Sequence, residues 1–244
     1  MTVMFIHGVP DTPRMWEPLI AALDLAPDDY TAPALPGFGV PCPAGFAATK
    51  EAYVDWLISL LETVVPRSGP VDLVGHDWGA LISLRVGHLQ PDLLRSLTLF
   101  DGCLVPGFRW HSYARTWQRP VVGELSMLAL TRSRMAQALT QWGLPPDLAR
   151  EETRQMNWTM KRSILSLYRS AVDVGTQWGT DLSGLPDRTQ VFWGETDPFG
   201  KPKYAARFCE QWNLPLHVEP GVGHWCFCER PEAFVKPLRD FWAR

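Results

Sequence analysis

The sequence lacks both an excess of positive charge and a long apolar run. Its 244 residues include 23 Lys and Arg and 26 Asp and Glu, for a formal net charge of -3. Because such a chain offers no basic face to a phosphate backbone, we expect no nucleic-acid partner. No apolar run is long enough to span a bilayer, so we expect no membrane partner. The N-terminal MTVMFIHG has no basic segment before its apolar residues, which favours a strand over a signal peptide.

Cysteine is also scarce. The five cysteines form no C-x-x-C pair, so the sequence indicates neither a disulfide framework nor a zinc knuckle. Cys226 and Cys228 lie close to His224, but a lone C-x-C falls short of the four ligands that structural zinc takes. We therefore expect a protein of the reducing cytoplasm that needs no metal and no organic cofactor.

A third absence concerns catalysis. The sequence contains no Gly-x-Ser-x-Gly motif, which argues against a serine esterase. Residues 75–79 have the frame of that motif, but Asp77 stands at the position of the serine. Glycines at both ends suit a tight strand-to-helix turn that pushes the central side chain into a cleft. The motif therefore predicts a carboxylate, in place of a hydroxyl group, at the centre of the site.

The residues that are present indicate an α/β fold. Short apolar runs alternate with helical patterns, which predicts a mostly parallel sheet with helices on both faces. The predicted strands cover residues 3–6, 30–34, 71–74, 96–100, 190–193 and 216–219, and the predicted helices cover 53–64, 78–89, 201–212 and 231–242. The alternation stops in a stretch of helix-like segments with several tryptophans. We therefore predict a core of residues 1–102 and 187–244, and an inserted helical cap of residues 103–186.

Chemically active residues follow four of the predicted strands. His7 follows the first strand, Asp77 the third, Asp197 the fifth and His224 the last. In an open α/β sheet the ligand binds beyond the carboxyl ends of the strands, so these side chains should meet at one edge. The order of nucleophile, acid and histidine along the chain is the one found in enzymes with a nucleophile elbow.

Asp77 is the predicted nucleophile. At a helix N-terminus the dipole and the free N–H groups favour an ionised carboxylate, which needs no base to activate it. A carboxylate displaces a leaving group from saturated carbon and forms an ester with the enzyme. Water activated by His224 then cleaves the ester, with Asp197 orienting the imidazole. The backbone N–H groups of Val9 and Trp78 are the predicted oxyanion hole.

Five motifs in this order resemble one branch of enzymes. They are H-G-V-P at 7–10, L-P-G-F-G at 35–39, G-H-D-W-G at 75–79, W-G-E-T-D-P at 193–198 and G-H-W at 223–225. Together they resemble the epoxide hydrolase and haloalkane dehalogenase branch of the α/β-hydrolase superfamily, over most of the chain outside the cap. The resemblance implies the α/β-hydrolase fold. The cap matches less well, and because the sequence starts at the strand before the oxyanion loop, we expect the family's first two strands to be missing.

The leaving group separates the two families. An epoxide oxygen leaves as a strongly basic alkoxide and needs an acid, which in relatives is a pair of cap tyrosines. Tyr168 resembles the tyrosine of the N-W-Y-R segment of epoxide hydrolases, and Tyr113 is the candidate for the second. The resemblance therefore implies an epoxide hydrolase that makes a vicinal diol from a small apolar organic substrate and water.

Two alternatives stay open. A halide needs only N–H donors, commonly the indole after the nucleophile, here Trp78, and a second Trp or Asn. Val9 stands where one dehalogenase group carries its asparagine, but Trp110 or Trp117 can serve instead, so a haloalkane dehalogenase is the second hypothesis. The third, from another class, is a binding protein of this fold without turnover. No triad member is missing, which argues against it.

Further residues are expected near the substrate. Asp101 follows the strand 96–100, where some dehalogenases place the acid that supports the histidine, but the fuller motif favours Asp197. His7 is expected to brace the oxyanion loop, and His76 to pack beside the site. The remaining predicted pocket residues are Pro10, Trp110, Trp117 and Trp225. The oligomeric state is not predicted.

Overall fold

A six-stranded sheet is the centre of the molecule. The computed structural model describes residues 2–105 and 107–243. Its strands are β1 (Val3–Ile6), β2 (Tyr30–Thr31), β3 (Val71–His76), β4 (Leu94–Phe100), β5 (Thr189–Gly194) and β6 (Leu216–Glu219). They lie in the order β2-β1-β3-β4-β5-β6, and each pair of neighbours is parallel. The predicted α/β fold with a mostly parallel sheet is therefore confirmed.

The central strands are apolar because both faces of the sheet are covered. Every residue of β1, β3 and β5 is buried, as expected for parallel strands between helical layers. The edge strand β2 has two residues, whereas the sequence pattern predicted 30–34. Pro33 has no N–H group to donate to a neighbouring strand, which accounts for the early end. β3 instead continues to His76 and so carries the chain directly to Asp77.

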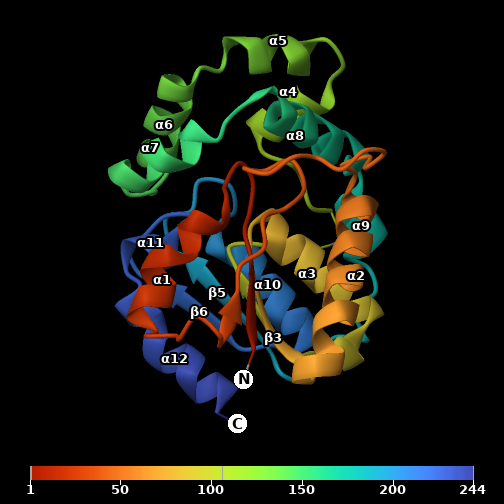
Figure 1. Ribbon diagram of the computed structural model, residues 1–244, viewed down its shortest axis with the longest axis vertical. Coiled ribbons are helices and arrows are strands. Elements are labelled where there is room, and N and C mark those ends of the chain that lie inside the picture. Colours follow the sequence, from red (N-terminus) through yellow and green to blue (C-terminus); the bar gives the residue numbers. More distant parts are fainter. Residues whose placement is uncertain (1, 106, 244) are drawn as a thin grey trace.

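Helices cover both faces of the sheet (Figure 1). They are α1 (Glu17–Ala22), α2 (Lys50–Ser68), α3 (Trp78–Leu89), α10 (Pro202–Trp212), α11 (Cys226–Glu229) and α12 (Glu232–Trp242), with 3₁₀ turns at Pro13–Trp16 and Pro91–Leu93. α1 packs against α11 and α12, and α2 packs against α3 on the other side. α2 begins earlier than predicted because the Thr49 side chain caps it, accepting a hydrogen bond from Ala52 N at 3.2 Å. None of the described helices is both long and apolar enough to cross a membrane.

The helices between β4 and β5 form a second layer. They are α4 (Ser112–Gln118), α5 (Val122–Ala129), α6 (Arg132–Gln141), α7 (Pro146–Arg154), α8 (Trp158–Ser170) and α9 (Val174–Trp178). Figure 1 places α4 to α8 above the carboxyl ends of the strands, whereas α9 lies beside α2, where Lys50 contacts the Trp178 ring. We call residues 103–186 the inserted segment. Its predicted status as a separate cap domain, with boundaries at 102/103 and 186/187, stays a prediction.

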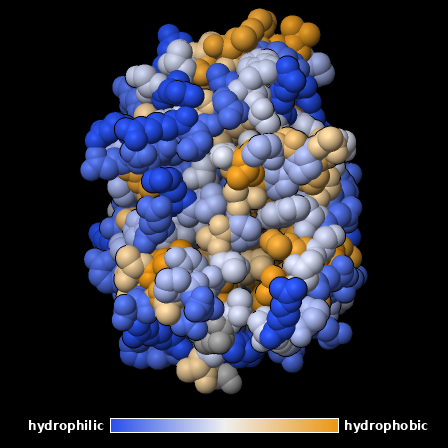
Figure 2. Space-filling model, viewed as in Figure 1, coloured by the Kyte–Doolittle hydropathy of each residue, from blue (hydrophilic) through white to orange (hydrophobic). Residues whose placement is uncertain are grey.

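The two layers differ in how much apolar surface they expose. In the core, Trp16 and Phe227 are fully buried and stack with ring centroids 4.4 Å apart. At α5, by contrast, Val121, Leu125 and Leu128 expose 67%, 60% and 65% of their surface. Figure 2 shows apolar side chains gathered over this helix at the top of the molecule. The space between the layers is therefore bounded by a tightly packed sheet on one side and by more exposed helices on the other.

Candidate active site

The turn between β3 and α3 presents Asp77 to the space between the layers. Asp77 has φ 51° and ψ -118°, a backbone conformation that residues with a side chain rarely adopt. The neighbouring chain can approach because Gly79 has no Cβ, which would overlap the carbonyl oxygens of Ile6 and His7. Strained backbone of this kind is typical of functional positions. Residues 75–79 thus form the sharp strand-to-helix turn that the motif predicts.

The loop after β1 lies against the Asp77 side chain. Val9 N donates a hydrogen bond to Asp77 Oδ1 at 2.9 Å. The His7 ring fixes this loop, because Nδ1 donates to Gly8 O at 2.8 Å and Nε2 accepts from Leu35 N at 2.9 Å. Burial lowers the pKa of His7 to about 4, so the ring is neutral at pH 7 and can do both. One predicted oxyanion donor therefore points at the predicted nucleophile.

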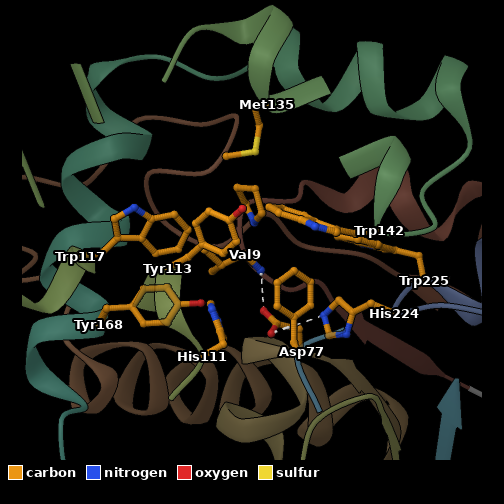
Figure 3. A pocket seen from close by; sticks show the side chains of 12 residues that line it. Val9, Asp77, His111, Tyr113, Trp117, Met135, Trp142, Tyr168, His224 and Trp225 are labelled. Carbon is orange, nitrogen blue, oxygen red and sulfur yellow. Dashed lines mark hydrogen bonds and ion pairs between the residues drawn. The ribbon is translucent and has the colours of Figure 1, made fainter. Parts of the chain in front are cut away.

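His224 lies between the carboxylates of Asp77 and Asp197, and Figure 3 shows it beside the first of them. Its Nδ1 is 2.9 Å from Asp197 Oδ2, and its Nε2 is 3.6 Å from Asp77 Oδ2. Asp197 is held in turn by Phe199 N, which donates a hydrogen bond to Asp197 Oδ1 at 2.7 Å. Three side chains that are far apart in the sequence therefore meet at one edge of the sheet.

The charges of these side chains favour an anion at Asp77. Burial opposes the ionisation of Asp77, but the hydrogen bond and the charge of His224 lower its pKa below the usual range. Burial likewise disfavours the imidazolium, but Asp197 and Asp77 together raise the pKa of His224 well above its usual value. Both shifts favour an anionic Asp77 beside a protonated His224 in the resting site.

A further carboxyl group, that of Asp101, lies near the imidazole at the end of β4. Its Oδ1 accepts a hydrogen bond from Gly194 N at 2.7 Å, and Cys226 Sγ lies 3.2 Å from its Oδ2. Burial and the charge of Asp197 raise the pKa of Asp101 well above its usual range, which favours the neutral acid. The residue that hydrogen-bonds to His224 is Asp197, the one that the longer motif favours.

This acidic cluster is also the place where a metal ion would find ligands. Ligand atoms of Asp101, Asp197 and His224 lie within 4.8 Å of one another. The hydrogen bonds described above account for all three side chains without an ion. Cys226 contacts Asp101, and Cys228 Sγ donates to a backbone oxygen at 3.1 Å, so the two cysteines contact different groups. We therefore interpret the C-x-C segment as part of the core packing.

The cavity above Asp77 has two lobes. The first encloses about 360 Å³ and the second about 400 Å³, counted with the parts that are open to solvent. Both are bordered by Asp77, His111, Phe199 and His224. The first is also lined by Val9, Pro10, Tyr113, Trp117, Met135, Trp142, Tyr168 and Trp225, and the second by Leu81, Asp101, Gly102, Cys103, Phe108, Trp110, Trp193 and Gly200. Apolar and aromatic side chains dominate, which suits small organic molecules.

The two predicted tyrosines lie in different environments. Tyr168, on α8, is 2% exposed, and its ring lies edge-on to Trp78 with centroids 5.4 Å apart. Burial, and then the charge of Asp77, raise the pKa of Tyr168 well above its usual range, so the hydroxyl group keeps its proton. Tyr113, on α4, is 48% exposed and packs against Trp142 at 5.1 Å. Tyr168 is therefore the better protected of the two candidate acids.

The indole of Trp78 is not among the described side chains that border the two lobes. It is fully buried beneath the rings of Trp110 and Tyr168. The Trp110 ring stacks on it with centroids 5.3 Å apart. The N–H group of Trp110 donates to Ala171 O at 2.7 Å. Trp117 does border the first lobe. The N–H group of Trp110 is therefore already bonded, whereas the buried N–H group of Trp78 makes no hydrogen bond to the described residues.

Some of the remaining predicted pocket residues line the cavity, and others are buried next to it. Pro10 and Trp225 border the first lobe. His7 and His76 are fully buried and are not among the described residues that line either lobe. The reason is that their rings serve neighbouring loops: His76 Nε2 lies 2.9 Å from the carbonyl oxygen of His224.

Comparison with known proteins assigns the chain to a family. The profile described as "Alpha/beta hydrolase family" matches residues 3–236. The chain belongs to the alpha/beta hydrolase family. A haloalkane dehalogenase from Bradyrhizobium elkani has a similar structure, with a TM-score of 0.79 and 20% identity over 99% of this chain and 89% of that chain. Epoxide hydrolase I from potato, Solanum tuberosum, has a TM-score of 0.77 and 22% identity, over 99% of this chain and 92% of the potato chain. These likenesses confirm the predicted α/β-hydrolase fold.

Sequence relatives match only part of this alpha/beta hydrolase. A haloalkane dehalogenase of Mycolicibacterium paratuberculosis is 30% identical over 46% of this chain and 40% of its own length. An epoxide hydrolase of Caballeronia sordidicola is 33% identical over 39% of this chain and 29% of its own length. The (E)-2-((N-methylformamido)methylene)succinate hydrolase of Acinetobacter baylyi is 31% identical over 41% of this chain and 37% of its own length. The matched stretches span two fifths of these relatives or less. The resemblance to the epoxide hydrolase and haloalkane dehalogenase branch is confirmed at this level.

Sequence analysis missed two residues of the hydrolase that border both lobes, His111 and Phe199. Phe199 lies two residues after Asp197, and its backbone holds that carboxylate, so its closeness to the W-G-x-x-D-P motif was an available signal. His111 lies two residues before Tyr113, the residue of this segment that the resemblance favours as a candidate acid. Nothing in the local pattern distinguishes the two side chains until the start of α4 is known.

Proposed function

We propose that this alpha/beta hydrolase opens small apolar epoxides to vicinal diols through an ester on Asp77. The observation that carries the proposal is the position of Tyr168, which is buried in the inserted segment and borders the same lobe as Asp77 (Figure 3). An epoxide needs attack at carbon and proton donation at oxygen. These two side chains supply both from opposite walls of one cavity.

In the first step Asp77 bonds to a carbon of the ring. Oδ2 is the attacking oxygen in this scheme, because Oδ1 already accepts the hydrogen bond from Val9 N. As the ring C–O bond breaks, its electron pair moves to oxygen, which takes the proton from Tyr168 Oη. The products are a hydroxyalkyl ester at Asp77 and a phenolate at Tyr168. The substrate oxygen, an alkoxide as it leaves, is basic enough to take a phenolic proton.

In the second step water cleaves the ester. Ester formation removes the negative charge of Asp77, which is one of the two charges that raise the pKa of His224. The imidazolium can then give up its proton, which re-forms the Tyr168 hydroxyl group, and the neutral ring accepts a proton from water, with Asp197 stabilising the imidazolium that forms. Val9 N–H lies where it can stabilise the oxyanion of the intermediate. As the intermediate collapses, its hydroxyl proton passes to the leaving alkoxide, which releases the diol and restores the Asp77 carboxylate beside the protonated His224.

A haloalkane dehalogenase is less well supported. A halide would need N–H donors in the cavity, but the indole of Trp78 is covered and that of Trp110 is bonded to Ala171 O. Valine at position 9 has no side-chain donor. Trp117 remains as an indole on the cavity wall. The arrangement therefore suits an oxygen leaving group better than a halide.

The contacts of His224 favour an enzyme over a non-catalytic binding protein. A protein that only bound its ligand would have no need of a strained, partly buried carboxylate with an imidazole 3.6 Å away. Nor would it need a further carboxylate, that of Asp197, at 2.9 Å from the same ring. This geometry is the one that two-step ester chemistry requires.

The proposal is tested by supplying two leaving groups side by side. The purified protein is incubated with styrene oxide and, separately, with a bromoalkane of similar size, and the diol and the bromide ion are measured. We expect the diol from the epoxide and little bromide. The Asp77→Asn variant serves as the control for spontaneous ring opening. Bromide without diol would favour a dehalogenase, and neither product would favour a binding protein.

A further inference from the structure

We propose that His111, and not Tyr113, is the second side chain that binds the substrate oxygen beside Tyr168. The inference rests on the proposed function, because it concerns the oxygen that leaves when Asp77 attacks carbon. His111 is the residue immediately before α4, on the wall that the inserted segment contributes to the cavity. Nothing in the motifs of the core concerns this position.

The cavity gives His111 the place that Tyr113 was expected to fill. His111 borders both lobes together with Asp77 and His224, whereas Tyr113 borders the first lobe. The rings of His111 and Tyr168 are nearly perpendicular, at 83°, with centroids 6.1 Å apart. Figure 3 shows the His111 ring beside the Tyr168 hydroxyl group. Tyr113 is half exposed, so water competes for its hydroxyl group.

The hydrogen bonds of His111 decide which ring nitrogen carries its proton. Nδ1 accepts a hydrogen bond from Ala114 N at 3.3 Å, so a neutral ring carries its hydrogen on Nε2. Burial, partly opposed by the charge of Asp77, lowers the pKa of His111 to about 4, which keeps the ring neutral at pH 7. His111 therefore brings an N–H donor, and not a second cation, to this wall.

Aromatic contacts connect His111 to the predicted base. Its ring packs against Phe199 with centroids 4.9 Å apart, and Phe199 packs against His224 at 4.8 Å. Phe199 is itself fixed by the hydrogen bond from its backbone to Asp197. The donor on the inserted segment is therefore held at a defined position relative to the groups of the core.

In the proposed step the two donors have different tasks. Tyr168 Oη gives its proton to the epoxide oxygen, and His111 Nε2–H donates a hydrogen bond to that same oxygen. His111 keeps its proton throughout, so it acts by stabilising negative charge while the C–O bond breaks. Removing one such donor costs about 10²-fold to 10³-fold in the rate of a step that develops charge on oxygen.

The experiment measures ring opening alone. In a His224→Gln background the ester on Asp77 is expected to accumulate, so intact-protein mass spectrometry with styrene oxide follows its formation. We expect His111→Ser in that background to slow adduct formation about 10²-fold. Serine preserves the cap of α4, because its hydroxyl oxygen can accept the helix N–H bond that Nδ1 now accepts. An unchanged midpoint of thermal unfolding checks that the fold is intact.

Two further variants separate the loss of the N–H donor from a loss of packing. If the smaller serine destabilises α4, His111→Leu fills the space without a donor and should be similarly slow. His111→Gln places an amide donor on the same wall and should recover part of the rate, which a purely packing role of the ring does not predict.

Tyr113→Phe in the same background is the matched comparison. We expect it to lose less activity than His111→Ser. Adduct formation at the parent rate in His111→Ser would overturn the inference, and so would a larger loss in Tyr113→Phe. The absence of any adduct in the His224→Gln parent would instead overturn the proposed function, and the assignment of His111 with it.

Discussion

The two walls of the cavity are held by different kinds of contact. On the core side, backbone N–H groups fix the carboxylates: Val9 N holds Asp77 at 2.9 Å, and Phe199 N holds Asp197 at 2.7 Å. On the side of the inserted segment, Tyr168 is held by aromatic rings, such as Trp110 with its centroid 5.1 Å away. The positions of the groups proposed to form and cleave an ester are thus fixed at the ends of strands. The positions of the groups that face the leaving atom are fixed by the packing of helices.

This contrast suggests a division of labour. Variants of the core wall should stop turnover of any substrate that forms an ester at Asp77. Variants of the inserted segment should change the rate according to how basic the leaving group is. The predictions below test that division, beginning with the largest expected effect.

Asp77→Asn should lower diol formation by at least about 10⁴-fold, because the amide is a poor nucleophile and the ester never forms. Diol is measured with styrene oxide, and the protein is examined by mass spectrometry for an adduct. We expect neither. Appreciable turnover would show that Asp77 is not the nucleophile, and the proposed ester mechanism would then be wrong.

His224→Gln should separate the two steps, lowering turnover by about 10³-fold or more while Asp77 still reacts. The glutamine cannot activate water, so the hydroxyalkyl ester should accumulate. Peptide mapping should find the mass of one substrate added to the peptide that contains Asp77. An unmodified peptide after long incubation would contradict the two-step scheme, because a single-step opening by water leaves no covalent trace.

The same contrast explains what the sequence could predict. Asp77, Asp197 and His224 follow strands of one parallel sheet, and the carboxyl ends of such strands must meet at one edge whatever joins them. His111 and Tyr113 had no such constraint. Which of them borders both lobes depends on where α4 begins and how it rotates against α8, and short helices are oriented by tertiary packing. The sheet topology therefore predicts which core residues meet, and the tyrosine pattern predicts Tyr168, but neither predicts that His111 borders both lobes.

Tyr168→Phe should lower the rate of ester formation by about 10²-fold, which is the usual contribution of a positioned general acid. The ring and its contacts with Trp78 and Trp110 are retained, so the loss isolates the hydroxyl group. The rate is measured as adduct formation in the His224→Gln background. A rate equal to that of the parent would return Tyr168 to a packing role and remove the main argument for an epoxide.

Acid should slow the second step before it slows the first. Burial opposes ionisation of Asp77, but His224 lowers its pKa, so the nucleophile stays anionic as the pH falls. Hydrolysis needs a neutral His224, whose pKa is raised by Asp197 despite burial. Below that pKa the neutral fraction falls about tenfold per pH unit. Quenched samples of the unaltered enzyme should therefore contain more alkylated protein at lower pH, and a fraction that rises with pH would contradict this.

The smallest effect is expected at Asp101, which is a further carboxyl group close to His224 beside Asp197. Burial and the charge of Asp197 raise the pKa of Asp101, which favours its neutral form, and asparagine matches that form in shape and charge. The amide oxygen can still accept the hydrogen bond from Gly194 N, so Asp101→Asn should change turnover by less than about threefold. Asp197→Asn is the matched control and should cost about 10⁴-fold, because it removes the carboxylate from the imidazolium. Similar losses in both variants would mean that the two acids share one task, and that the motif at 193–198 describes only half of the support for His224.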